Sequence, residues 1–215
     1  MNFSRLLNLI LGGALIAVTA LLVISLNSNP EATEKVPVTE SKQAEAVVLN
    51  NIATRASVRA FKRDAIPEAA VEKILKAGMA APTALNAQPW HFIVISDREK
   101  LKSLSTASDY TGLLADAPMA IAVCGDMTKK AKSAEGIYWV HDACAASENI
   151  LLAAHAMGLG ATWTGSYPIE TRYQLAQKVL SLPENLIPVS IIAIGYPAVP
   201  VDAKDKWNPN NVSYQ

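Results

Sequence analysis

The sequence predicts an α+β fold in which helices cover both faces of a small sheet. Four short apolar runs have the length and composition of strands, and helical stretches of unequal length separate them. One of these stretches, residues 137–157, is apolar almost all round, as expected for a buried helix. Few strands among many helices favour layers of helices packed on a sheet. The four predicted strands are residues 92–96, 119–124, 161–163 and 189–194.

The first three predicted helices lie before residue 107. Residues 44–54 are expected to form a helix that leads into a pair of arginines. Pro67 suits the first turn of the second helix, where its missing N–H needs no partner, and the acidic Glu68 follows it. Asp97 is expected to start a short third helix that ends near residue 106.

The long helix at residues 137–157 is rich in alanine, which lets another helix approach closely. Its lack of a polar face fits a core helix within one subunit and an interface between two subunits equally well. Gly158 is expected to end this helix as a C-terminal cap. Pro183 follows the last predicted helix, residues 170–180, and cannot continue it.

The charge balance and the cysteine count exclude several classes of protein. The chain has 19 Lys and Arg against 19 Asp and Glu, so no basic surface suggests a nucleic-acid partner. Neither Cys124 nor Cys144 belongs to a CxxC motif, and the three histidines are scattered, so we expect no metal site. Both cysteines are expected to be reduced core residues, and a disulfide between them remains open.

The N-terminal 26 residues are expected to be a membrane anchor or a signal segment. The stretch from Leu6 to Leu26 carries no charge and is long enough to cross a hydrocarbon core of about 30 Å. We therefore expect a membrane-anchored protein, with export after signal cleavage and a buried helix as alternatives. The flanking charges leave the side of the membrane open. Residues 27–43 are predicted to be a linker, and residues 44–215 a single domain.

Two arginines and a serine alternate just after the first predicted helix. In an extended segment the side chains of Arg55, Ser57 and Arg59 would point to one side. Two guanidinium groups with a hydroxyl suit a phosphate and its attached polyol, because arginine matches phosphate oxygens with two hydrogen bonds. Taken alone, these residues also fit a solvated surface segment.

A polar loop leads into the first predicted strand. Pro82 and Pro89 bracket Thr83, Asn86 and Gln88, and prolines restrict the backbone so that the polar groups keep one geometry. Asn86 offers a donor and an acceptor at a fixed spacing, which suits the edge of a heteroaromatic ring. A simple helix-to-strand connection is the alternative.

Together these blocks resemble the nitroreductase family of FMN-dependent oxidoreductases. The Arg-x-Ser-x-Arg block is similar to the family's opening motif, and the second block is similar to its APSxxNxQPWxF loop. Two later segments resemble the family's glycine-rich stretch beside the flavin ring, and its closing strand with a basic tail. The motifs follow the family's order from about Asn51 to the C-terminus, at residues 55–59, 82–92, 158–165, 195–197 and 204–206.

The resemblance implies a three-layer α-β-α fold with a small mixed sheet, in an intertwined homodimer with FMN at the subunit interface. Arg55 and Arg59 would pair with the FMN phosphate, and Ser57 would hydrogen-bond the ribityl chain or the pyrimidine edge. Lys204 and Lys206 would add positive charge near the phosphate, although a solvated lysine pair is the alternative.

The resemblance also implies two contacts with the flavin ring. Thr164 and Gly165 would offer backbone N–H groups near flavin N5, where a hydride arrives and leaves. A loop of the partner subunit would approach the same ring through Pro82, Thr83, Ala84 and Asn86.

The implied activity is transfer of electrons from NADH or NADPH, through FMN, to a nitroaromatic, a quinone or a similar acceptor by a ping-pong mechanism. No side chain of the motifs is expected to be an obligatory acid or nucleophile, and His91 and His155 are interpreted as structural. Residues 103–119 lack the extra flavin-binding residues and the lid of larger family members, so the acceptor stays open, as does the choice of nicotinamide. A dehalogenase-like flavoenzyme and a flavin- or partner-binding protein without turnover are the alternatives.

Overall fold

A four-stranded antiparallel sheet forms the centre of the fold. The structure is a computed structural model that describes residues 38–132 and 136–215. The chain divides into two units, and the second unit, residues 47–215, holds the sheet and every site discussed below. The sheet has the order β1-β2-β4-β3. The main elements are α2 (Val38–Thr54), α3 (Glu68–Met79), β1 (Trp90–Ile95), α4 (Arg98–Leu104), β2 (Met119–Asp126), α5 (Tyr138–Ala156), β3 (Gly160–Gly165), α6 (Glu170–Leu180) and β4 (Leu186–Gly195).

All three strand pairings are antiparallel. The family resemblance led us to expect a mixed sheet, but within residues 38–132 and 136–215 the parallel component is a single bridge between Ser57 and Ala161. Strand β2 lies inside the sheet and all of its residues are buried. Burial on both faces explains why its sequence is apolar without alternation.

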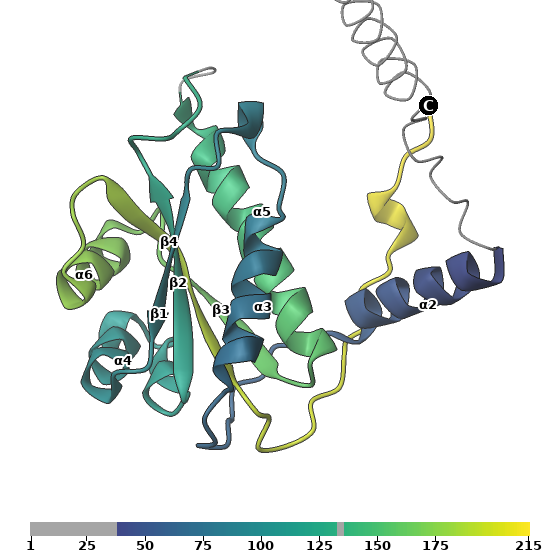
Figure 1. The fold of residues 1–215 in the computed structure, drawn as a ribbon, viewed down its shortest axis with the longest axis horizontal. Helices are drawn as coiled ribbons and strands as arrows, with labels where there is room; N and C mark the ends of the chain where they lie inside the picture. Colours follow the sequence, from purple (N-terminus) through teal and green to yellow (C-terminus); the bar gives the residue numbers. More distant parts are fainter. Residues whose placement is uncertain (1–37, 133–135) are drawn as a thin grey trace, which may run out of the picture. The chain divides into compact units, whose positions relative to one another are not determined.

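Helices cover both faces of the sheet, with α3 and α5 on one side and α4 and α6 on the other (Figure 1). Side chains that alternate along a strand point to opposite faces, so each face has its own core. Ile121 and Ile192 pack with Ile150 in the core under α3 and α5. Ala122 and Ile191 belong to the core under α4 and α6. The predicted α+β fold with three layers is confirmed.

The helices begin and end close to the predicted residues, with one exception. Pro67 precedes α3, and the side chain of Asp97 caps α4 by accepting hydrogen bonds from two backbone N–H groups of its first turn. Gly158 follows α5 with a φ of 73°, a conformation that glycine adopts without strain. Helix α2 is the exception, because it begins at Val38, inside the predicted linker of residues 27–43.

One face of α5 is buried within this chain. Trp139, Ala146, Ile150 and Ala154 belong to the core that α5 shares with α3 and the sheet. The core interpretation of this helix is therefore confirmed for that face. The interface interpretation concerns a second subunit and stays a prediction.

Both cysteines have free thiols, as expected, and the disulfide that the sequence left open is not formed. Cys124 is buried in β2, and burial raises the pKa of its thiol to about 12. Cys144 on α5 is partly exposed, and burial raises the pKa of its thiol as well. Both thiols therefore stay protonated at neutral pH.

The expectation of a membrane-anchored protein is corrected. Across residues 38–132 and 136–215, no helix combines the length and the apolar character needed to cross a bilayer. The stretch from Leu6 to Leu26, on which the expectation rested, lies outside those residues.

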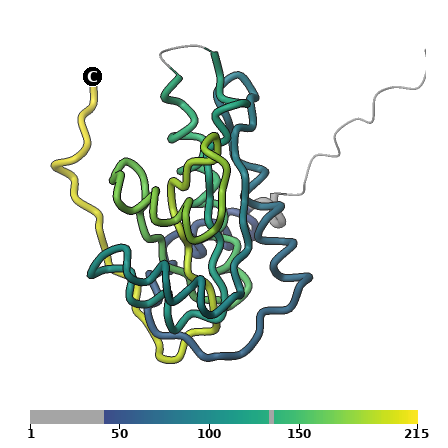
Figure 2. The backbone as a smooth tube through the Cα atoms, turned by 90° about the vertical axis from the view of Figure 1, so that its left-hand side faces the viewer, coloured from purple at the N-terminus to yellow at the C-terminus, as the bar shows by residue number. Residues whose placement is uncertain are grey.

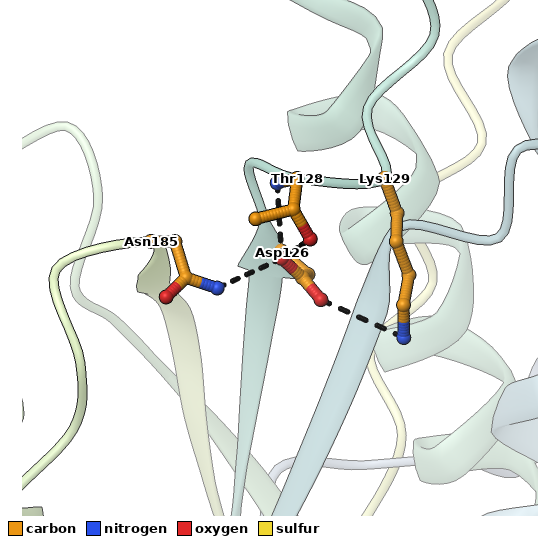
Figure 3. Close-up of polar contacts among 4 residues, drawn as sticks. All are labelled: Asp126, Thr128, Lys129 and Asn185. Carbon is orange, nitrogen blue, oxygen red and sulfur yellow. Dashed lines mark hydrogen bonds and ion pairs between the residues drawn. The ribbon is translucent and has the colours of Figure 1, made fainter.

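Asp126, the last residue of β2, connects three segments at one end of the sheet (Figure 3). Its carboxylate accepts hydrogen bonds from the side chains of Thr128 (2.7 Å) and Asn185 (2.9 Å), and Lys129 forms an ion pair with it at 3.5 Å. Its backbone N–H donates to the carbonyl of Pro89 at 2.5 Å. Because Asn185 precedes β4 and Pro89 precedes β1, the network fixes the loop before β1 relative to β2 and β4.

Candidate functional site

The Arg-x-Ser-x-Arg segment lies along the outer edge of β3. Ser57 forms a parallel bridge with Ala161, and the Val58 N–H donates to the Ala161 carbonyl at 3.2 Å. The hydroxyl of Thr162 in turn donates to the Val58 carbonyl at 2.5 Å. A Cβ at Gly160 would lie 2.6 Å from the Val58 Cβ, so only glycine allows this close approach. The glycine-rich segment thus positions the arginine motif.

A cavity of about 350 Å³ opens beside this edge of the sheet. Its wall includes the guanidinium-bearing side chains of Arg59 and Arg172 together with Thr164 and Gly165. A Cβ added to Gly165 would meet no atom within 4 Å, so the end of β3 leaves open space there. The other lining residues are Ser108, Asp109, Tyr110, Thr111, Gly112, Leu113, Thr162 and Trp163.

Two cations face this cavity without a carboxylate partner in the described part of the chain. Arg59 donates to the Ser57 carbonyl at 3.4 Å, and Arg172 donates to the Gly165 carbonyl at 3.5 Å. Neither guanidinium takes part in any of the ion pairs of residues 38–132 and 136–215. Asp109 lines the cavity too and offsets part of the positive charge. The remaining positive charge favours an anionic ligand.

Arg55 is separated from this cavity. Its side chain is 18% exposed, and its Nε lies 3.6 Å from a carboxylate oxygen of Glu148 on α5. Ser57 is half-buried against β3. The predicted common polar face of the three residues is therefore only partly formed, because Arg59 lines the cavity while Arg55 faces α5.

The loop before β1 has an unusual backbone. Leu85, Asn86 and Gln88 have φ values of 53°, 52° and 49°, in the left-handed region that residues other than glycine rarely adopt. Each such residue costs on the order of 1 kcal/mol or more. Hydrogen bonds from the Gln88 N–H to the Thr83 hydroxyl (3.2 Å) and from the Gln88 side chain to Oδ1 of the Asn86 side chain (2.9 Å) hold the loop together.

Asp142 on α5 connects that loop to the body of the fold. The Ala84 N–H donates to its Oδ1 at 2.9 Å. The residue is only 4% exposed, and its Oδ2 has no hydrogen-bond partner among the residues that the structure describes. Burial raises the pKa of this carboxyl, although the hydrogen bond from Ala84 works against the shift.

The structure does not bring all predicted site residues together within one chain. Pro82, Thr83, Ala84 and Asn86 lie in the loop beside α5, and none of them lines the cavity of Arg59. Lys204 and Lys206 lie in the C-terminal segment, which is exposed from residue 198 onward and runs apart from the other chain segments (yellow in Figure 2). The predicted site residues of one chain thus lie in three separate places: the arginine motif beside β3, the loop before β1 and the C-terminal segment.

Sequence reasoning missed two contributors to the site. Arg172 stands in the first turn of α6, where the helix dipole disfavours a cation, and this mismatch was a signal that could have identified it. Asp142 is an acidic residue in the first two turns of a largely apolar helix, which was a second such signal. Residues 108–113, in the stretch where no flavin-binding counterpart was found, also line the cavity.

Comparisons with known proteins identify the same family as the sequence motifs. The sequence model of the nitroreductase family matches residues 52–111 and 108–196. A proposed NADH dehydrogenase/NAD(P)H nitroreductase of Methanothermobacter thermautotrophicus is 42% identical over 175 residues, which cover 80% of this chain and 89% of that protein. A protein of Archaeoglobus fulgidus with the same description is 44% identical over 167 residues, or 76% of this chain and 95% of that protein.

Solved structures give the same result. The crystal structure of a proposed NADH dehydrogenase/NAD(P)H nitroreductase from Bacteroides thetaiotaomicron has a TM-score of 0.73 and 41% identity, and the match covers 78% of this chain and 96% of that one. A proposed nitroreductase of Desulfovibrio desulfuricans, solved in complex with FMN, has a TM-score of 0.68 and 31% identity over 78% of this chain and 96% of that chain.

Proposed function

Since the chain belongs to the nitroreductase family, we propose that it is an FMN-dependent oxidoreductase that passes electrons from NADH or NADPH to a nitroaromatic, a quinone or a similar acceptor. The observation that carries this proposal is the cavity at the end of β3, with two guanidinium groups and the open space beside Gly165. The relative from Desulfovibrio desulfuricans, which was solved with FMN, supports the same cofactor.

The residues of the cavity fit FMN. A phosphorylated polyol requires a cation and a hydroxyl group, which Arg59 and Ser108 supply on the cavity wall. A planar ring requires space beside the strand, and the missing Cβ of Gly165 leaves that space open. Net positive charge in the cavity suits an anionic cofactor.

We assign the phosphate to the arginine motif and the C-terminal lysines. Arg59 would pair with the phosphate from the cavity wall, and Ser57 would hydrogen-bond the adjacent polyol. Arg55 would add charge from its position beside α5, where Glu148 holds its side chain in place. Lys204 and Lys206 lie on the exposed C-terminal segment and would add positive charge near the phosphate.

A second copy of the chain would complete the site. Pro82, Thr83, Ala84 and Asn86 lie outside the cavity of their own chain, so they would meet the flavin only from a partner subunit. The strained, hydrogen-bonded form of their loop supports this role, because strain of this kind is retained where a ligand requires a fixed geometry. We therefore propose a homodimer with two equivalent sites at the subunit interface.

When bound, FMN would supply the two-electron chemistry, so the chain's own residues need not act as nucleophiles. The backbone N–H groups of Thr164 and Gly165 would orient the ring and stabilise negative charge near N5. Asn86 would hold the ring edge through its amide. His155 donates to or accepts from the Thr54 hydroxyl at 2.9 Å, which agrees with a structural role for this histidine.

Absorption spectroscopy of the purified protein tests the proposal. FMN is added first and NADH or NADPH afterwards, with a nitroaromatic and a quinone as final acceptors. We expect a flavin spectrum that bleaches with nicotinamide and recovers with acceptor. A protein that takes up FMN but never bleaches would instead support the flavin-binding alternative without turnover.

A further inference from the structure

Arg172 is a cation in a position that the fold alone does not favour. It lies in the first turn of α6, where the partial positive charge of the helix N-terminus repels a guanidinium. The acidic residue of the same turn, Glu170, accepts a hydrogen bond from Gln174 and not from Arg172. Within the described residues, Arg172 makes one long hydrogen bond, 3.5 Å to the Gly165 carbonyl.

The two guanidinium groups of the cavity are held at separate points along β3. Arg59 is bonded to the carbonyl of Ser57, which is bridged to Ala161, the second residue of the strand. Arg172 is bonded to the carbonyl of Gly165, four residues further on, or about 13 Å along a strand. The two anchoring carbonyls thus lie at different ends of the strand, which fits a ligand that meets the two cations at different points along its length.

We propose that Arg172 is a cofactor-binding residue that faces the ring of FMN and stabilises its reduced form. The inference rests on the proposed function, which assigns the ring to the Gly165 end of the cavity and the phosphate to the Arg59 end. Two electrons and one proton, the content of one hydride, convert the neutral ring to a ring with one negative charge. A cation beside the ring therefore binds the reduced form more tightly than the oxidised form.

A contact with the ring and a contact with the phosphate have different effects on the binding of oxidised and reduced FMN. The phosphate carries the same charge in both forms of FMN, so an arginine at the phosphate strengthens the binding of both forms equally. An arginine at the ring strengthens the binding of the reduced form alone. By linkage, only the ring contact changes the midpoint potential of the bound cofactor.

The test compares the holoenzyme with the variants Arg172→Gln and Arg172→Lys. Lys178→Gln is the matched control, because Lys178 lies in the last turn of the same helix and does not line the cavity. Fluorescence titration gives the Kd of oxidised FMN, and equilibration with redox dyes gives the midpoint potential. We expect Arg172→Gln to leave the Kd of oxidised FMN unchanged and to weaken the binding of reduced FMN about tenfold, which lowers the two-electron potential by about 30 mV.

Arg172→Lys is expected to have a midpoint potential close to that of wild type, and Lys178→Gln is expected to have the same midpoint potential as wild type. An unchanged potential in Arg172→Gln, with or without a weaker Kd for oxidised FMN, would overturn the inference and leave the proposed function intact. Failure of the wild-type protein to take up FMN would overturn both. Circular dichroism of each variant verifies that it is folded.

Discussion

The backbone N–H of Ala84 donates a 2.9 Å hydrogen bond to Oδ1 of Asp142, which lies 58 residues further along the chain. This contact joins a strained loop to a buried position of α5. The loop is the segment that we assign to the FMN site of the partner subunit. In the proposed homodimer, a carboxyl group in the core of one subunit would therefore position a loop that acts in the other.

The first prediction concerns this contact. Asp142→Ala leaves the Ala84 N–H without its acceptor, and we expect a loss of about 1–3 kcal/mol in the free energy of unfolding together with weaker FMN binding. Asp142→Asn keeps an acceptor oxygen in the same place and should retain FMN binding. Urea unfolding and flavin fluorescence titration measure the two effects. Equal FMN affinity in Asp142→Ala and wild type would show that the contact does not position the loop.

The raised pKa of Asp142 predicts that the difference in stability between Asp142→Asn and wild type depends on pH. Burial favours the neutral carboxyl, so the ionised form costs stability as the pH rises above its ordinary value of 3.8. Asn removes this cost. The stability of Asp142→Asn relative to wild type should therefore be higher at pH 7 than at pH 3, as measured by urea unfolding. A difference that is the same at both pH values would contradict the assigned cause.

The second prediction compares two glycines of β3. Gly160→Ala places a Cβ 2.6 Å from the Val58 Cβ and should lower the free energy of unfolding by about 1–3 kcal/mol. Gly165→Ala meets no atom within 4 Å, so its stability should match wild type while its added methyl group obstructs the cavity. We expect weaker FMN binding in Gly165→Ala despite normal folding. If the FMN affinity of that variant equals that of wild type, the flavin ring does not lie beside Gly165.

The third prediction concerns Asp126. Burial alone would raise the pKa of its carboxyl, but hydrogen bonds from Thr128 and Asn185, with the charge of Lys129, lower it from 3.8 to about 2. The folded state thus favours the carboxylate, and the resulting stability is complete above about pH 4 and is lost as the pH falls towards 2. It amounts to about 2 kcal/mol.

Asp126→Asn should remove this stability at pH 7 and have little effect near pH 2. Urea unfolding of the FMN-free protein at several pH values measures the difference. Asp202→Asn, an exposed position of the C-terminal segment, is the control and should match wild type throughout. If the loss of stability in Asp126→Asn does not become smaller as the pH falls, the network stabilises the fold by packing and not by charge.

The helices and strands could be predicted from local sequence patterns. The site could be predicted only in part, because it depends on contacts between distant segments. Helix α6 has the bounds that the sequence predicted, Glu170 to Leu180, and Pro183, which cannot continue it, is a local signal. The apolar run of β2 likewise predicted a buried strand. Local patterns do not report which cavity a side chain faces, so Arg55 and Arg59 were assigned one face, although Arg55 contacts α5 and Arg59 lines the cavity beside β3. The roles of Arg172 and Asp142 depend on contacts with Gly165 and Ala84, which only the fold brings near.

The last prediction concerns the phosphate end of the site. Arg55 is held by Glu148 and is largely buried, whereas Lys206 is exposed on the C-terminal segment. A held guanidinium offers two hydrogen bonds at little cost in side-chain entropy, and charged hydrogen bonds contribute roughly 1.5–3 kcal/mol each. Arg55→Ala should therefore raise the Kd for FMN about tenfold or more, and Lys206→Ala should raise it less.

Glu148→Gln provides the control, because it breaks the ion pair and keeps the guanidinium. If Arg55 binds phosphate, this variant should bind FMN more tightly than Arg55→Ala, since the guanidinium is still present, but less tightly than wild type, since it is no longer held in place. If Arg55 serves only to hold α5, both Arg55→Ala and Glu148→Gln should lose stability in urea unfolding while their FMN affinity stays at the wild-type value. Flavin fluorescence titration of the three variants decides between these outcomes, because the two roles predict opposite patterns of affinity and stability.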